Sequence, residues 1–230
     1  MNKIFDLLNL YKVYATSLQA KTLEEFKEFT LKSNELFNLT AITDSDEFDE
    51  KMILDSATGL IDIDVKHKSI IDVGTGAGYP GMVLKILHPE GHFTFLDSTQ
   101  KKINNLQVFA IANKITATFV ADRVESYAKA HRESFDYVTA RAVAALPILL
   151  ETCIPLVKVN GYFIAYKGKE VESEIKDSKL ALEKLNCRIE RIFNFTLPSG
   201  EERNILYIKK IKETNTKYPR EYNEIKRKHL

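Results

Sequence analysis

The sequence predicts an α/β fold with an open, mostly parallel sheet of seven strands, helices on both faces and an N-terminal helical extension. Three observations favour this fold. From residue 69 onward, short apolar runs alternate with stretches of helical periodicity, as in sheets whose parallel strands are joined by helices. The first apolar run ends directly in a glycine-rich turn, and the last two runs lie too close together for a connecting helix.

Residues 1–60 are expected to form the helical extension. Thr22 and Glu25 have the spacing of a capping box, and the apolar residues that follow them recur at helical intervals. Asp44 or Ser45 is placed to cap the next helix, because both follow a turn-rich segment and precede an apolar stretch.

The remaining elements follow from the alternation of the two periodicities. The parallel strands are expected at residues 69–73, 92–97, 115–120, 136–140 and 161–166. The helices between and after them are expected at about 79–88, 99–113, 122–131, 145–157 and 169–185. Two further strands, 188–196 and 203–210, are joined by the short segment LPSGEE, so this pair should be antiparallel.

Composition limits the class of protein. The chain has 230 residues, 44% of them hydrophobic, which is enough for a substantial core. No apolar run is long enough to span a membrane, and the N-terminus lacks the features of a signal peptide. The two cysteines form no C-x-x-C pair and the five histidines are scattered, so we expect a cytoplasmic protein without a metal site.

Charge is distributed unevenly along the chain. Residues 1–60 carry 6 Lys or Arg and 11 Asp or Glu, whereas residues 203–230 carry 9 Lys or Arg and 3 Asp or Glu. We expect one structural unit with a helical extension (1–60), a ligand-binding core (61–210) and a basic tail (211–230). The tail is either a binding site for a polyanion or an ordinary solvated segment.

The turn after the first strand predicts a ligand site, because ligands of open parallel sheets bind beyond the carboxyl ends of the strands. Asp72 precedes Gly74, Gly76 and Gly78, which matches the acidic-x-G-x-G-x-G turn of S-adenosylmethionine sites. The same glycines with Gly81 also satisfy the G-x-G-x-x-G pattern of dinucleotide sites. The carboxylate favours the methyl donor, since it would attract an ammonium and a sulfonium but repel a diphosphate. A purely structural turn is the third possibility.

Two further strand ends complete the expected cofactor site. Asp97 ends the second strand, where an acid accepts hydrogen bonds from ribose hydroxyls, although it is also placed to cap a helix. After the third strand, backbone groups around Val124 are expected to face the adenine, with Val124 as an apolar wall. Asp122 is placed to cap the helix that begins there.

The fourth strand ends at Arg141, which is expected to position the methyl acceptor or the cofactor carboxylate; a surface salt bridge is the alternative. Cys153 lies within an apolar helical pattern and is expected to be a core residue rather than a nucleophile. No general base or covalent nucleophile is evident. This suits an acceptor that is nucleophilic when neutral, such as guanine N7, for which alignment and exclusion of water are sufficient.

These motifs also resemble those of the bacterial small-subunit ribosomal RNA guanine-N7 methyltransferases, once called glucose-inhibited division protein B. The similarity runs from about residue 35 to 220. The matching segments are Asn38-Leu39-Thr40 with Ala41-Ile42, Leu54-Asp55-Ser56, DVGTGAGYPG, Leu96-Asp97-Ser98 with Lys101, Arg123-Val124-Glu125, Ala140-Arg141-Ala142-Val143, Lys167-Gly168, EER at 201–203 and KYPR at 217–220.

The resemblance implies a class I methyltransferase, Rossmann-like fold and transfer of a methyl group from S-adenosylmethionine to N7 of one guanine in the decoding-region loop of 16S ribosomal RNA. It implies cofactor contacts at Gly74, Tyr79, Val124, Glu125 and Arg141. The expected partner is 16S ribosomal RNA or the small ribosomal subunit, and the protein is expected to be a monomer.

The chain departs from the family pattern at two places. Met52 stands where the family commonly has a histidine, and EYNEIKRKHL replaces the usual residues after KYPR. Neither departure is expected to touch the cofactor pocket.

Contacts with RNA are expected from aromatic side chains that stack on bases and from cations that bind phosphates. The aromatic candidates are Tyr79, Tyr166 and Tyr218, and the cationic candidates are Lys101, Lys167, Lys217 and Arg220. Packing of the tyrosines in the core and solvation of the lysines are the alternatives. The rival functions are an NAD-dependent oxidoreductase, a non-catalytic RNA-binding assembly factor, and a methyltransferase for a small molecule.

Overall fold

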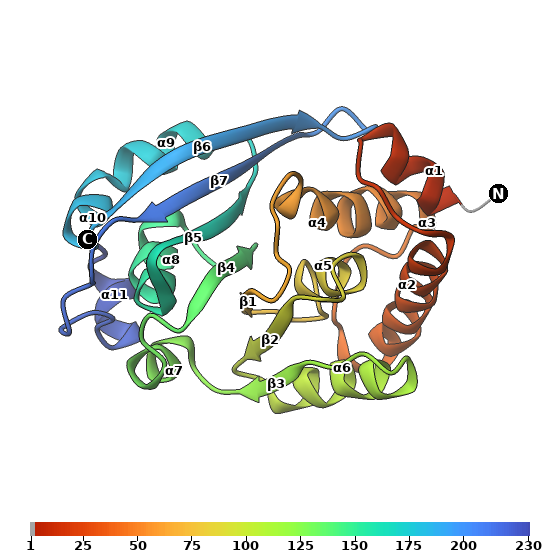
Figure 1. Ribbon diagram of the computed structural model, residues 1–230, viewed down its shortest axis with the longest axis horizontal. Helices are drawn as coiled ribbons and strands as arrows, with labels where there is room; N and C mark the ends of the chain where they lie inside the picture. The colour runs from red at the N-terminus through yellow and green to blue at the C-terminus, as the bar shows by residue number, and fades with distance from the viewer. Residues whose placement is uncertain (1–2) are drawn as a thin grey trace.

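The computed structural model describes residues 3–230 and contains one seven-stranded sheet (Figure 1). The strand order is β3-β2-β1-β4-β5-β7-β6. The first five strands are parallel, and β7 is antiparallel to both of its neighbours. The order reverses between β1 and β4, so the carboxyl ends of these strands open a crevice for a ligand.

The strands are β1 (Ser69–Val73), β2 (His92–Asp97), β3 (Thr118–Ala121), β4 (Phe135–Arg141), β5 (Val157–Lys167), β6 (Cys187–Thr196) and β7 (Glu202–Lys210). The longer helices are α1 (Lys3–Leu10), α2 (Ser17–Phe37), α5 (Gly81–Leu87), α6 (Gln100–Ala112), α7 (Val124–Ala130), α8 (Leu146–Cys153), α9 (Val171–Asp177), α10 (Lys179–Lys184) and α11 (Tyr222–Arg227). Short helical turns are α3 (Ser45–Phe48), a π-helical turn (Asp49–Leu54), α4 (Asp55–Ala57) and two 3₁₀ turns (Thr58–Leu60, Ile154–Leu156).

All seven expected strands are present, and the pair β6 and β7 is antiparallel as expected. The expected helix over 169–185 is divided into α9 and α10 at Ser178. The N-terminal capping box is placed differently from the expectation. Thr16 caps α2 through a reciprocal pair with Gln19, whereas Thr22 lies inside the helix and donates to the Leu18 carbonyl. Asp44 caps α3, as expected, by accepting from the amides of Asp46 and Glu47.

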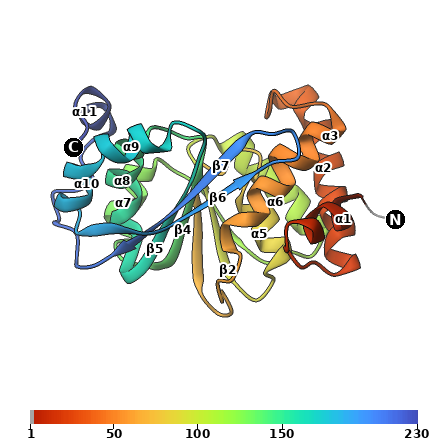
Figure 2. The same ribbon diagram turned by 90° about the horizontal axis from the view of Figure 1, so that it is seen from above.

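The helices form one layer on each face of the sheet (Figure 2). One apolar cluster joins α1, α2, α5 and α6 to one face, with Phe26 and Phe95 fully buried within it. The other cluster joins α8 and α10 to the opposite face and contains Cys153, which has no exposed surface. The core position expected for Cys153 is therefore confirmed.

The C-terminal tail is packed against the rest of the protein. Ile225 of α11 is fully buried, and α11 contacts α8. Glu151 of α8 has no exposed side-chain surface and accepts three hydrogen bonds from Arg220, at 2.6, 2.7 and 3.1 Å. Within residues 3–230, no helix combines the length and the hydropathy that a membrane span requires.

Candidate cofactor and acceptor site

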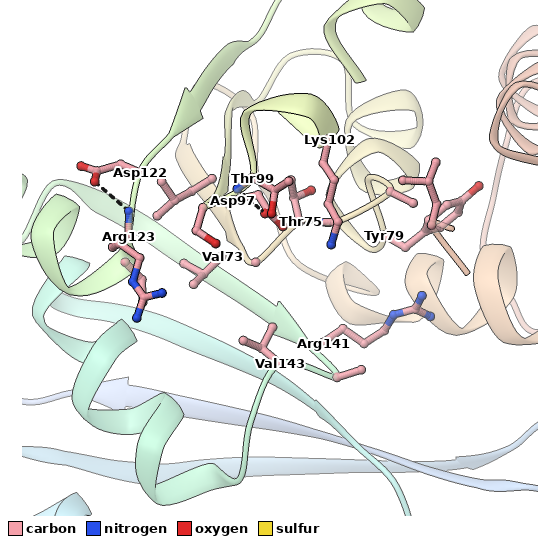
Figure 3. A pocket seen from close by; sticks show the side chains of 18 of the residues that line it. Val73, Thr75, Tyr79, Asp97, Thr99, Lys102, Asp122, Arg123, Arg141 and Val143 are labelled. Carbon is pink, nitrogen blue, oxygen red and sulfur yellow. Dashed lines mark hydrogen bonds between the residues drawn. The ribbon is translucent and has the colours of Figure 1, made fainter. Parts of the chain in front are cut away.

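A cavity of about 550 Å³ lies where the carboxyl ends of β1, β2 and β4 meet (Figure 3). Its volume is within the range of small-molecule sites. The lining residues come from the glycine turn, the ends of these strands, the start of α7 and the C-terminal tail. Among them are Val73, Gly74, Thr75, Gly76, Tyr79, Asp97, Thr99, Lys102, Asp122, Arg123, Val124, Glu125, Arg141, Val143 and Tyr222.

Asp97 links the end of β2 to the glycine turn. Its Oδ2 accepts from the Gly76 amide at 3.0 Å, and its Oδ1 accepts from the Thr99 amide at 2.8 Å. Asp97 is largely buried yet lines the cavity, so its carboxylate is fixed at the place where a ribose would lie. Thr75 also lines the cavity, and its buried hydroxyl lies close enough to the Asp72 carboxylate to lower the pKa of that group.

The structure corrects the expected position of the Asp72 carboxylate. Asp72 is fully buried and does not line the cavity. Its Oδ2 accepts from the Gly81 amide at 3.0 Å, and its Oδ1 accepts from the Thr139 hydroxyl at 2.7 Å. Burial raises the pKa of Asp72 to about 6. The Asp72 side chain therefore supports the glycine turn on the side away from the cavity. This close contact requires a glycine at residue 81, because a Cβ there would lie 2.6 Å from Asp72 Oδ2.

The buried position of the Asp72 carboxylate also affects which ligand the glycine turn can bind. A diphosphate in a dinucleotide fold binds to the free amides at the start of the first helix. Here the amide of Gly81, the first residue of α5, already donates to a carboxylate. The Gly81 amide is therefore not free to bind a diphosphate.

The glycines of the turn have different tasks. Gly76 has a φ of +57° and lines the cavity, and a Cβ at this residue would meet only the Gly74 carbonyl oxygen, at 3.8 Å. A ligand can therefore approach this backbone closely. Gly78 has a φ of +99° and faces Leu106 and Phe26 instead, so its role is to pack the turn against α2 and α6 rather than to line the cavity.

The start of α7 forms the side of the cavity where adenine is expected. Val124 and Glu125 both line it, and Glu125 accepts from Arg123 Nε at 3.0 Å. Tyr222 of α11 also lines this side, and the Arg123 guanidinium lies over its ring. No pattern in the sequence pointed to Tyr222. The expectation that the divergent tail does not touch the pocket is therefore wrong.

Arg141 lies between this cavity and a second one of about 620 Å³. Its guanidinium donates to the Lys51 carbonyl at 2.7 Å and to Met52 Sδ at 3.2 Å, and lies 3.3 Å from Asp55 Oδ2. It also lies 5.8 Å from the ring centroid of Tyr79. Arg141 is thus held by residues of the N-terminal extension beside both cavities rather than in a surface salt bridge. Met52, the other departure from the family pattern, lines both cavities, so the expectation that it does not touch the cofactor pocket is also wrong.

The residues expected to contact RNA fall into two groups. Lys101 and Lys217 are exposed, and their phosphate role stays a prediction. Lys167 is buried and donates to Glu174 at 2.7 Å, and Arg220 is bound to Glu151, so both cations are already paired within the protein. Lys102, rather than Lys101, lines the first cavity.

The tyrosines proposed to stack on bases are all buried. Tyr79 packs on Phe26 with ring centroids 4.9 Å apart, although it also lines the cavity. Tyr166 donates to the Ser56 carbonyl at 2.8 Å. Tyr218 is 4% exposed, so stacking on it would require a rearrangement.

The family profile described as "rRNA small subunit methyltransferase G" matches residues 19–206 of the chain. The chain belongs to the rRNA small subunit methyltransferase G family. The family relatives include "Ribosomal RNA small subunit methyltransferase G" of Bacillus cytotoxicus, 45% identical over 212 residues and 89% of each chain. The Bacillus subtilis relative of the same name is 42% identical over 212 residues, again 89% of each chain.

Solved structures support the fold alone. A ribosomal protein L11 methylase from Lactobacillus delbrueckii subsp. bulgaricus aligns with a TM-score of 0.54 and 17% identity, covering 70% of this chain and 79% of that one. A SAM-dependent methyltransferase from Aquifex aeolicus aligns with a TM-score of 0.52 and 15% identity, covering 72% of this chain and 93% of that one. The class I methyltransferase fold is therefore confirmed.

Within residues 3–230, no group of three or more His, Cys, Asp or Glu is arranged to hold a metal ion.

Proposed function

We propose that this protein transfers a methyl group from S-adenosylmethionine to N7 of a guanine in 16S ribosomal RNA, in the cytoplasm. The observation that carries the proposal is the cavity at the glycine turn, with Asp97 fixed beside Gly76, in a chain of this family. The partner is the small-subunit RNA, either free or within the subunit, and the protein acts as a monomer.

The lining residues fit the methyl donor. Asp97 is placed for the ribose hydroxyls, and Val124, Glu125 and Tyr222 surround the adenine position. The methionine end would lie along Gly74 and Gly76, whose backbone lines the cavity. The cofactor supplies a methyl group on a positively charged sulfur.

The chain's own contribution is alignment. Cys153 is buried, which raises the pKa of its thiol to about 12 and keeps it uncharged. A covalent intermediate on this cysteine is therefore not part of the proposed reaction. Guanine N7 carries a free lone pair, so the protein needs to hold the base in line with the methyl group and to exclude water. Arg141 is the residue proposed to orient the acceptor, because it lies between the two cavities.

The test is methyl transfer to small ribosomal subunits from a strain that lacks this modification. The full chain is incubated with these subunits, or with free 16S RNA, and S-adenosylmethionine carrying a labelled methyl group. Label at N7 of a single guanine is expected. Label on another atom, or none on either substrate, would overturn the proposal.

Binding experiments on the same protein preparation distinguish the proposed function from two rival functions. Calorimetric titration with S-adenosylmethionine and with NAD should show binding of the former only, which excludes the oxidoreductase. A non-catalytic assembly factor would bind S-adenosylhomocysteine and the subunit without transferring a methyl group.

A further inference from the structure

The second cavity adjoins the first across a shared wall. Met52, Arg141, Ala142 and Val143 line both cavities. A planar group in the second cavity can therefore present one edge to the first cavity and another edge to residues that line only the second cavity. Several of its lining residues, among them Ile42, Asp55 and Arg203, belong to the segments that carry the family resemblance, although these segments did not indicate a second cavity.

Beside Arg141, the second cavity contains a buried carboxylate that can accept further hydrogen bonds. Asp55 lines the second cavity, and its side chain is 8% exposed. Its Oδ2 is approached by Arg141 Nη1 at 3.3 Å and by Arg203 Nε at 3.5 Å, both longer than strong charge-assisted hydrogen bonds. Its Oδ1 has no hydrogen bond from any residue in the range 3–230.

The other acidic group in this cavity is more exposed, and one of its oxygens already accepts two short hydrogen bonds. Glu174 Oε2 accepts from Lys167 Nζ at 2.7 Å and from the Leu146 amide at 2.6 Å. Asp55 is therefore the more buried carboxylate of the cavity, and the one with the longer contacts to its partners.

A carboxylate with this freedom matches one edge of guanine. The Watson–Crick edge of guanine offers two neighbouring N–H donors, N1 and the 2-amino group, whereas N7 and O6 on the Hoogsteen edge are acceptors. Adenine has an unprotonated N1, which a carboxylate would repel. With the Watson–Crick edge on Asp55, guanine N7 points to the shared wall and O6 lies on the side of Arg141, a donor.

We propose that the second cavity holds the acceptor guanine and that Asp55 selects it by accepting hydrogen bonds from N1 and the 2-amino group. This inference rests on the proposed function and adds the base-recognition residue to it. Arg141 and Arg203 keep the Asp55 carboxylate in place, and Arg141 also contacts O6.

The test compares guanosine with inosine at the acceptor position of reconstituted small subunits, because inosine lacks only the 2-amino group. The wild-type protein should methylate the guanosine substrate with a kcat/KM at least about tenfold higher, as expected when a charged acceptor loses a donor. In Asp55→Asn this ratio should fall toward one. In Glu174→Gln, which alters the other carboxylate of the cavity, the ratio should equal that of the wild type.

Because each ratio is measured within one variant, partial loss of folded protein does not change it. A second measurement uses the wild type alone: 6-thioguanosine at the acceptor position should photocrosslink to residues of the second cavity. Equal ratios in the wild type and Asp55→Asn, a wild-type ratio near one, or crosslinks outside this cavity would each refute the role of Asp55. Those results leave the proposed function standing, whereas absence of methyl transfer to guanosine would refute the function itself.

Discussion

The Arg123 guanidinium lies 5.0 Å from the ring centroid of Tyr222, although 99 positions separate the two residues along the chain. Both line the first cavity, on the side where adenine is expected. Tyr222 is held there from both directions, by the Arg220 contacts with Glu151 and by the buried Ile225. The C-terminal tail is therefore a wall of the candidate cofactor site.

Replacing Tyr222 tests this role of the tail. Tyr222→Ala should weaken S-adenosylmethionine binding by about 1 kcal/mol or more, because an aromatic surface beside the base is lost. Tyr222→Phe keeps the ring and should bind nearly as the wild type does. Tyr14→Ala, at an exposed tyrosine far from the cavity in sequence, is the control. Calorimetry measures all four proteins, and equal affinity of Tyr222→Ala and the wild type would remove Tyr222 from the site.

Arg220 is expected to act in folding rather than in RNA binding. Arg220→Ala removes the cation and two of the three hydrogen bonds of the buried Glu151 carboxylate, which should cost about 3 kcal/mol in the free energy of unfolding. Urea denaturation measures this change.

Lys217→Ala is the matched variant for Arg220→Ala, because Lys217 is a nearby exposed cation. It should leave the unfolding free energy unchanged and reduce the salt dependence of RNA binding. The reverse outcome, weaker RNA binding but unchanged stability in Arg220→Ala, would restore the phosphate role of Arg220.

Asp97→Ala should lower the affinity for S-adenosylmethionine by about 1–3 kcal/mol, because the ribose hydroxyls and the Gly76 amide lose their acceptor. Asp122→Ala removes a carboxylate from the same cavity that does not contact the glycine turn, and a smaller effect is expected. If both variants lost affinity equally, the general negative charge of the cavity, rather than the fixed position of Asp97, would be responsible.

Asp72 should make stability dependent on pH. Its pKa is raised by burial from 3.8 in the unfolded chain to about 6 in the folded protein, so the folded state binds the proton more tightly. The stabilisation from this proton is complete below the unfolded pKa and is lost as the pH rises through about 6, a loss of up to about 3 kcal/mol.

Asp72→Asn removes the titration and can keep both hydrogen bonds, with the amide oxygen accepting from Gly81 and the amide nitrogen donating to Thr139. Urea unfolding at about pH 4 and about pH 7 should therefore show a smaller loss of stability in Asp72→Asn than in the wild type. Asp64→Asn, at an exposed carboxylate, serves as the control. The same pH dependence in all three proteins would contradict the assignment.

The fold could be predicted because its periodicities are local. Strands β1 and β2 begin and end at the expected residues, since each is a short apolar run bounded by polar residues or glycine. Strand β5 begins at Val157 instead of 161, although Lys158 and Asn160 interrupt the apolar pattern. The strand is longer because Phe135 of β4 pairs with Val157 across a bulge. Pairing with another strand cannot be predicted from the residues of β5 alone.

The sequence by itself determined the order of strands and helices, the glycine turn, and the strand ends that carry Asp97 and Arg141. The direction in which Asp72 faces, the pairing of Arg220 with Glu151, the position of Tyr222 and the second cavity around Asp55 were decided only by the tertiary structure. The physical reason is that the periodicity of apolar residues indicates which face of a helix or strand is buried. Whether a buried polar group meets a ligand or another part of the chain depends on distant segments that packing brings together.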